Sequence, residues 1–209
     1  MMAMNDNTTE RVKEIKRSFK LMMNGVTAQS MRDKGLDYHV NWGASLPMLK
    51  EKAAELGKNY ELAIALWKEN VRECKILATL IMPAEQILPE VVDIWMEQTV
   101  SIEIAELAAF NLYQYLPFAA EKAYQWIASD KEICQLCGFS VLSRLFMNRQ
   151  EPNERGINEY IDQVLVALQG GSMPVKKAAL ASINRFAELG LVYERLAENA
   201  LKSINRELF

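Results

Sequence analysis

Apolar residues recur at helical spacing along almost the whole chain, and no stretch alternates with the strict period of a β-strand. The first helical segment covers about residues 8–23 and ends at Asn24-Gly25, because these two residues are typical of a helix end. A short helix near 27–34 follows, and the irregular stretch 37–47 comes next. This pattern predicts a protein built from helices alone.

From Ser45 onward the helices are predicted to come in pairs. Ser45 is a candidate N-cap, with Pro47 in the first turn and Gly57 just beyond the end of the helix. Asp130 is a second candidate cap. The segments expected to pair are 59–69 with 71–82, 88–98 with 101–116, 118–128 with 130–147, and 157–169 with 174–189, and a last helix covers 191–207.

Neighbouring pairs recur every 30 to 40 residues or so, which is the spacing of helical repeat proteins. A single amphipathic pair cannot bury its apolar face, so the pairs must stack on one another. We therefore predict an all-α chain with the αα-superhelix of a HEAT/ARM-like solenoid, made of about six helix pairs in one domain over residues 1–209. Periodicity alone does not distinguish this fold from an ordinary helical bundle.

Composition limits the classes of function. Half of the residues are apolar and 24% are charged, as in globular proteins, and no apolar run reaches the roughly 18 residues of a membrane helix. The first residues lack the apolar core of a signal peptide, so we expect a cytoplasmic protein that does not bind membranes. A net charge of −3 is unusual for a protein that binds nucleic acid, although clustering of positive charge on one face decides that question.

Few residues have the spacing of a metal or cofactor site. Cys134 and Cys137 form a C-x-x-C within a predicted helix, where buried thiols are the simpler interpretation because zinc sites need a second pair. His39 is the only histidine and is expected in a loop or at the surface. Phosphate-binding and dinucleotide-binding glycine motifs are absent from the sequence. We expect no cofactor.

Two kinds of charged residue are candidates for function. Glu97, Glu103 and Glu106 lie around the start of one helix, where a pair of carboxylates could do acid–base chemistry or simply face solvent. Basic residues gather on several helices, and in a solenoid such residues could line a groove complementary to a phosphate backbone. These basic residues are Lys13, Lys16, Arg17, Lys20, Arg144, Arg149, Lys176, Lys177 and Arg185.

Three stretches resemble the HEAT-like-repeat alkylpurine DNA glycosylases, the AlkD-like DNA alkylation repair family. The first has Leu66-Trp67 followed by Arg72-Glu73 and Ala78; the second begins at Trp126; the third is VKKAALASINRFAELG, with Lys176 and Lys177. Gly43 and Pro47 also lie where the family turns into an early helix. The resemblance covers most of residues 30–190.

The resemblance implies a solenoid whose concave face binds double-stranded DNA and releases alkylated purines. The family does so with an aspartate and two tryptophans that stabilise the charge of the transition state, and with an arginine that contacts the DNA near the lesion. Aligned without gaps on Trp126, this chain has Glu97 and Ser182 at the tryptophans, Ser101 at the aspartate and Leu136 at the arginine. A small shift brings Glu103 to the carboxylate position. Arg144 and Arg185 fall where the family keeps basic residues that face DNA.

Three hypotheses follow. The first is a divergent family member that has lost the usual catalytic residues and contacts the DNA backbone through Arg144, Arg185, Lys176 and Lys177. The second is a protein–protein interaction scaffold, which the acidic composition favours. The third is an active but divergent alkylpurine glycosylase that uses Glu103, or Glu97, as its catalytic carboxylate.

Overall fold

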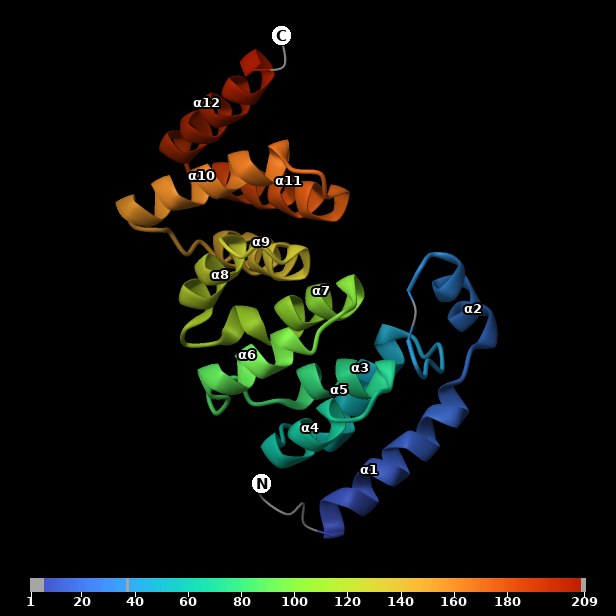
Figure 1. The fold of residues 1–209 in the computed structure, drawn as a ribbon. Helices are drawn as coiled ribbons and strands as arrows, with labels where there is room; N and C mark the ends of the chain where they lie inside the picture. The colour runs from blue at the N-terminus through green and yellow to red at the C-terminus, as the bar shows by residue number, and fades with distance from the viewer. Residues whose placement is uncertain (1–5, 37, 208–209) are drawn as a thin grey trace. The chain divides into compact units, whose positions relative to one another are not determined.

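The computed structural model describes residues 6–36 and 38–207 (Figure 1). Within them the chain forms twelve α-helices and two short 3₁₀ helices, and the only β-type pairing is one bridge between Val40 and Val71. The prediction of an all-α chain is thereby confirmed. The chain divides into two compact units, residues 1–112 and 113–209.

The first unit contains seven α-helices. Its elements are α1 (Asp6–Phe19), η1 (Lys20–Met22), α2 (Gly25–Asp33), α3 (Leu46–Leu56), α4 (Tyr60–Trp67), α5 (Arg72–Ile81), α6 (Pro89–Glu97) and α7 (Ile102–Asn111). Helix α5 is central, because it packs against α3, α4 and α7. The Trp67 and Trp95 rings stack with 4.1 Å between centroids and join the core of α4 to that of α6.

The second unit contains five α-helices. Its elements are η2 (Tyr113–Tyr115), α8 (Ala119–Ile127), α9 (Glu132–Met147), α10 (Glu154–Gln169), α11 (Met173–Ala187) and α12 (Leu191–Glu207). Aromatic side chains fill the centre: the Tyr160 ring contacts those of Phe139, Phe146 and Phe186. Helices α8 and α9 approach closely at Gly138, where an added Cβ would lie 2.8 Å from the Ala123 carbonyl oxygen.

Most predicted helix ends agree with the structure. Ser45 is the N-cap residue of α3, Pro47 lies in its first turn, and Gly57 ends it with a φ of 68°. Helix α10 begins three residues before its predicted start, because the Asn153 side chain caps it by accepting a hydrogen bond from the Gly156 N–H.

Two predicted features are wrong. The helix predicted over 101–116 stops at Asn111, because Leu112 leaves helical geometry (φ −133°, ψ −58°) and η2 follows. The predicted cap Asp130 is not used: the N-cap residue of α9 is Lys131, without a side-chain cap. Ser129 organises this turn instead, since its hydroxyl accepts from the Lys131 N–H and its carbonyl accepts from the Gln135 side chain.

Candidate functional site

The predicted site residues lie in different units: Glu103 is in the first, and Arg144, Lys176, Lys177 and Arg185 are in the second. Each unit is described by itself. In the first unit the structure reveals a group of hydrogen-bonded charged and polar side chains around Glu103, of which Arg72 and Glu73 are buried and the others half-buried. We call it the Arg72 cluster: Tyr38, Arg72, Glu73, Ser101 and Glu103.

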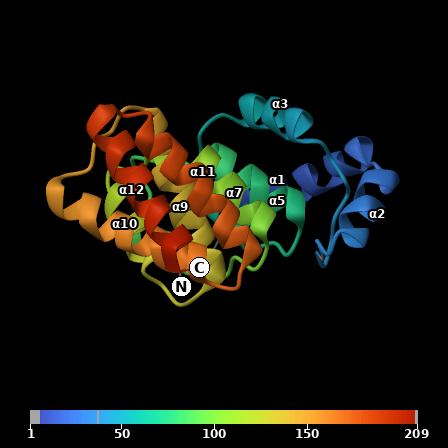
Figure 2. The same ribbon diagram turned by 90° about the horizontal axis from the view of Figure 1, so that it is seen from above.

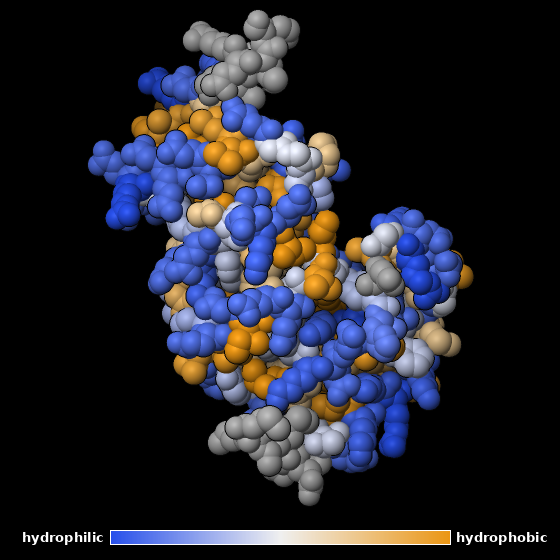
Figure 3. Space-filling model, in the orientation of Figure 1, coloured by the Kyte–Doolittle hydropathy of each residue, from blue (hydrophilic) through white to orange (hydrophobic). Residues whose placement is uncertain are grey.

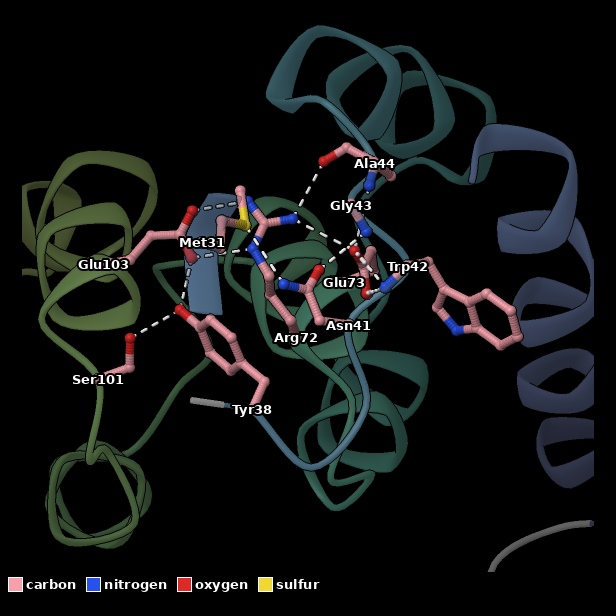
Figure 4. Close-up of polar contacts among 10 residues, drawn as sticks. All are labelled: Met31, Tyr38, Asn41, Trp42, Gly43, Ala44, Arg72, Glu73, Ser101 and Glu103. Carbon is pink, nitrogen blue, oxygen red and sulfur yellow. Dashed lines mark hydrogen bonds and ion pairs between the residues drawn. The ribbon is translucent and has the colours of Figure 1, made fainter. Parts of the chain in front are cut away.

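Arg72 is the centre of this cluster (Figure 4). Its side chain is only 3% exposed, at the start of α5. The guanidinium donates two hydrogen bonds to the Glu103 carboxylate, from Nε to Oε2 at 2.9 Å and from Nη2 to Oε1 at 2.6 Å. Its Nη1 donates to the Ala44 carbonyl and to Glu73. Planar bidentate pairing of this kind is the strong form of an ion pair, and here it joins α5 to α7.

Glu73 has a different task, because its carboxylate holds the backbone of an irregular segment. It is fully buried and accepts hydrogen bonds from the Trp42 N–H at 3.1 Å and from the Ala44 N–H at 3.2 Å. A buried carboxylate without such donors would be costly. The segment before α3 therefore takes its shape from α5.

Gly43 lets this segment lie directly against the turn between η1 and α2. Its φ is +72°, and an added Cβ would stand 2.2 Å from the Asn24 carbonyl oxygen, closer than any real contact. Asn24 in turn donates its backbone N–H to the Trp42 carbonyl at 2.9 Å. Only glycine meets both demands, the left-handed φ and the absence of a side chain.

Tyr38 and Ser101 complete the cluster beside Glu103. The Tyr38 hydroxyl donates to Glu103 Oε2, and it lies 2.6 Å from the Ser101 hydroxyl. Burial raises the pKa of Tyr38, and the hydrogen bond to Glu103 raises it further, so Tyr38 stays a neutral donor.

The Glu103 carboxyl is held in its ionised form. Burial alone would raise its pKa, but the hydrogen bonds from Arg72 and Tyr38, together with the charge of Arg72, outweigh burial and lower the pKa. A carboxylate with a lowered pKa and three donors is well suited to fix the position of Arg72. It is poorly suited to take up a proton as a general base.

The other two candidate carboxylates lie at the surface. Glu97, at the end of α6, and Glu106, on α7, are both exposed, as the simpler interpretation predicted. Partial burial and the nearby charge of Glu103 raise the pKa of Glu106. The catalytic role of Glu103 stays a prediction.

Among the described residues no tryptophan ring is fully exposed, so none is freely available to contact a DNA base. Trp67, Trp95 and Trp126 are all buried. Trp42 is half-buried, and its ring points away from the Arg72 cluster (Figure 4). The aromatic faces of this chain therefore serve packing more than recognition.

In the second unit α11 packs against α9 and overlaps it when seen from above (Figure 2), and hydrogen bonds join the two helices at both ends. At their N-terminal ends the Ser172 hydroxyl donates to the Glu132 carboxylate at 2.9 Å. At their C-terminal ends Arg149 Nη1 donates to the backbone carbonyl of Glu188. Residues of the two helices therefore keep a fixed relation to one another.

Arg149 has an uncommon backbone. It follows α9 with a φ of 60°, in a position where helices usually have glycine. The Gln150 N–H bonds back to the Leu145 carbonyl, and the Arg149 N–H to that of Phe146, which is the Schellman arrangement. An arginine here costs some backbone strain and gains the contact with Glu188.

The four predicted DNA-binding residues lie on these two helices. Lys176 and Lys177 are in the first turns of α11, half-buried and exposed respectively, and neither has a hydrogen-bonded or ionic partner among the described residues. Arg144 is half-buried near the end of α9 and donates to the Gln114 side chain. Arg185 is paired with the exposed carboxylate of Glu188 at 2.8 Å.

The basic residues of α1 have acidic partners. Lys13 and Arg17 both face Glu10, and Lys16 pairs with Glu69 of the α4–α5 connection at 2.6 Å. Lys20 is exposed and has no such partner in the described part of the chain. The first helix is therefore only partly available to an anion.

Cysteine and histidine behave as the sequence predicted. Cys74, Cys134 and Cys137 are buried thiols, and burial raises the pKa of Cys74 to about 12. His39 is exposed in a bend. Within the described ranges no group of three His, Cys, Asp or Glu side chains is placed to hold a metal ion.

A model of the DNA alkylation repair enzyme family matches residues 9–165, well over half of the chain. The chain belongs to this family. No curated protein matches it. Among the described residues, no helix has the length and apolar character to cross a membrane.

A solved structure resembles this chain with a TM-score of 0.80 and 20% sequence identity. The match covers 94% of this chain and 82% of the chain in the solved structure. It belongs to a family of proteins related to the HEAT-like repeat DNA glycosylases with affinity for branched DNA structures. This likeness confirms the HEAT-like fold class. Whether the chain forms one domain stays a prediction.

The four positions that the ungapped alignment on Trp126 assigns to the family's tryptophans, aspartate and arginine hold side chains with other contacts. Ser182 is fully buried and bonds with the Tyr160 hydroxyl at 2.9 Å, and Leu136 lies in the core of α9. Ser101 belongs to the Arg72 cluster, and Glu97 is exposed.

The sequence pattern does not reveal the Arg72 cluster, although Arg72-Glu73 lies in one of the stretches that resemble the family. One signal is present in the sequence: two adjacent charged residues at the start of a mainly apolar helix. Charges in such a place need partners, because an unpaired buried ion is costly. The main partner of Arg72 is Glu103, which lies 31 residues further along the chain, so residue spacing does not predict the contact.

Proposed function

We propose that this chain is a divergent DNA alkylation repair family member that binds DNA through its phosphate backbone and lacks the family's usual catalytic set. The single observation that carries the proposal is the pair Lys176 and Lys177, whose ammonium groups have no partner among the described residues. Family membership and the branched-DNA affinity of the structural relative support it.

Helix α11 provides the geometry of the interface. Lys177 and Arg185 are eight residues apart on α11, about 12 Å along the helix and about 80° around it, so both can face one DNA backbone, whereas Lys176 lies on the opposite side of the helix from Arg185. Arg144 adds a charge from α9, which is fixed to α11 at both ends. Arg185 is shared with Glu188, so we expect the two lysines to contribute more.

The contacts of Ser182 and Glu103 support the proposal that this chain lacks the family's usual catalytic set. A base-contacting aromatic face is missing at Ser182, which is buried under Tyr160. The Glu103 carboxylate is already bonded to Arg72 and Tyr38. We propose on this basis that Glu103 positions Arg72 and does not contact DNA.

The affinity of the full chain for a linear duplex, measured by fluorescence anisotropy over a range of salt concentrations, tests the DNA-binding proposal. We expect binding that weakens steeply and linearly with log salt, because each neutralised phosphate releases counterions. Absence of salt-dependent binding at low ionic strength would overturn it.

Release of 7-methylguanine from methylated duplex DNA tests the proposal on chemistry. We expect the wild type to release no more than a buffer control. Release well above that control, abolished in Glu103→Gln, would instead support an active glycosylase that uses Glu103 as its carboxylate.

A further inference from the structure

The turn between α1 and α2 presents three large apolar side chains to solvent. Leu21 is 89% exposed, Met23 61% and Val26 82%, values that approach those of an unfolded chain. We call residues 20–26 the apolar corner. On the face drawn in Figure 3 the surface over α1 and α2 is mainly hydrophilic, so apolar residues here are an exception. Scattered single apolar residues need no explanation, but three within six residues do.

The apolar corner is held firmly by the rest of the first unit. Asn24 caps α2 by accepting a hydrogen bond from the Thr27 N–H at 3.0 Å, and its own N–H donates to the Trp42 carbonyl. Glu73 holds the Trp42 and Ala44 N–H groups, and Gly43 leaves room for the Asn24 carbonyl. The Arg72 cluster therefore supports the surface on which Leu21, Met23 and Val26 are displayed.

Positive charge surrounds the corner. Residues 10–36 contain seven basic and three acidic side chains, although the whole chain has a net charge of −3. Lys20 directly precedes Leu21, and Arg17 lies about one helical turn before it; both side chains are exposed, although Arg17 also faces Glu10. An anionic partner with an accessible apolar surface would match this combination of cations around an apolar centre.

DNA with an exposed base face fits that description. A continuous duplex offers phosphates at its surface and keeps the faces of its bases stacked, whereas a branch point, a gap or an end exposes a base face. An anionic lipid surface would also attract cations, but residues 20–26 contain no tryptophan, tyrosine or phenylalanine, the usual anchors at a membrane interface.

We propose that the apolar corner is a second DNA-contact site, at which Leu21, Met23 and Val26 pack against an exposed base face while Arg17 and Lys20 contact the flanking phosphates. This inference rests on the proposed DNA-binding function. It assigns to α1 and α2 a preference for interrupted DNA, separate from the charge contacts proposed for α11.

The test uses the double variant Leu21→Ser/Val26→Ser in the full chain. Both side chains are exposed, so the fold is not at risk. Its affinity is compared with that of the wild type for a four-way junction and for a linear duplex with the same number of phosphates, with every end of both DNAs blocked by bound streptavidin so that only the branch point exposes a base face. The matched control, Leu191→Ser/Val192→Ser, removes two apolar side chains that are 74% and 67% exposed at the start of α12.

We expect the corner variant to lose about ten-fold in affinity for the junction, because two apolar side chains no longer pack against the exposed base face. Its affinity for the duplex and its salt dependence should equal those of the wild type. The α12 control should bind both DNAs normally. A 2-aminopurine beside the branch point should change its fluorescence on binding of the wild type and not of the corner variant.

Three outcomes would overturn the inference. Equal junction affinity of wild type and corner variant removes it while leaving the proposed DNA binding intact. Absence of binding to either DNA by the wild type removes both. Binding to phosphatidylserine vesicles that the corner variant loses, with unchanged junction binding, assigns the corner to a lipid surface instead.

Discussion

Arg72 and Glu103 are joined by two parallel hydrogen bonds, at 2.9 and 2.6 Å, although they lie 31 residues apart in the chain. The Arg72 side chain is 3% exposed, so removal of Glu103 leaves its charge largely desolvated and without its main partner. The pair therefore links α5 and α7 through an interaction that is costly to break from one side.

Glu103→Ala should lower the free energy of unfolding by about 3 kcal/mol, because it leaves the buried Arg72 charge without its main partner. Glu103→Gln retains the shape and some hydrogen bonds, so we expect a loss of about half that size. Urea denaturation followed by circular dichroism measures both. Glu97→Gln, at the exposed end of α6, is the control and should change little; an equally mild Glu103→Ala would contradict the assignment.

The same carboxylate predicts a pH dependence. The pKa of Glu103 is lowered in the folded protein from its usual 4.5, so the ion pair contributes its full stability above that value and loses it as the pH falls through the lower folded pKa. We expect the unfolding free energy of the wild type to fall more steeply below pH 4.5 than that of Glu103→Gln. Parallel curves would contradict a lowered pKa.

Gly43 and Gly57 form a natural comparison. Their φ values are +72° and +68°, but an added Cβ at Gly43 meets the Asn24 carbonyl whereas one at Gly57 meets nothing within 4 Å. Gly57 has a ψ of −179°, in a region that only glycine adopts readily, so Gly57→Ala should cost backbone strain alone, about 1–3 kcal/mol. Gly43→Ala should cost clearly more, since the corner must move. Thermal unfolding of both variants measures the difference, and equal losses would show that the close approach is unimportant.

Lys176 and Lys177 predict the salt dependence of DNA binding. In Lys176→Gln/Lys177→Gln the slope of log affinity against log salt should become shallower by almost two units, because each phosphate contact contributes about 0.9. The control Lys52→Gln/Lys202→Gln changes the net charge equally but removes lysines paired with Glu55 and Glu198. An equal change of slope in both variants would indicate a general charge effect without a defined interface.

Two substitutions of Arg149 distinguish the effect of backbone strain from the effect of the side-chain contact with Glu188. Arg149→Ala loses the bond to the Glu188 carbonyl and keeps the left-handed φ, whereas Arg149→Gly loses the bond and relieves the strain. We expect the glycine variant to be the more stable of the two by about 1 kcal/mol. Chemical denaturation of both variants tests this, and the opposite order would mean that residue 149 is not strained.

Local signals predicted most of the fold. Ser45, Pro47 and Gly57 bound α3 as expected, since capping and helix termination depend on neighbouring residues. The break at Leu112 was missed because an apolar residue with no glycine or proline beside it gives no local sign of a helix end. Tertiary packing decides such positions.

The candidate sites were predicted less evenly. Exposure of Glu97, Glu106 and His39 followed from their local pattern. The bond between Glu103 and Arg72 did not, since it depends on how α5 meets α7. The pairing of Arg185 with Glu188 was within reach of the sequence, because residues three apart on a helix lie on one face.

The two ties between α9 and α11 have a consequence for recognition. Ser172 with Glu132 at one end and Arg149 with Glu188 at the other fix the helices before any ligand arrives. The entropy cost of arranging the backbone beneath Arg144, Lys176 and Lys177 has thus been met during folding. A partner that binds to these residues has to order only the ends of their side chains. Because less conformational entropy is lost on binding, each charge contact contributes more to the net affinity.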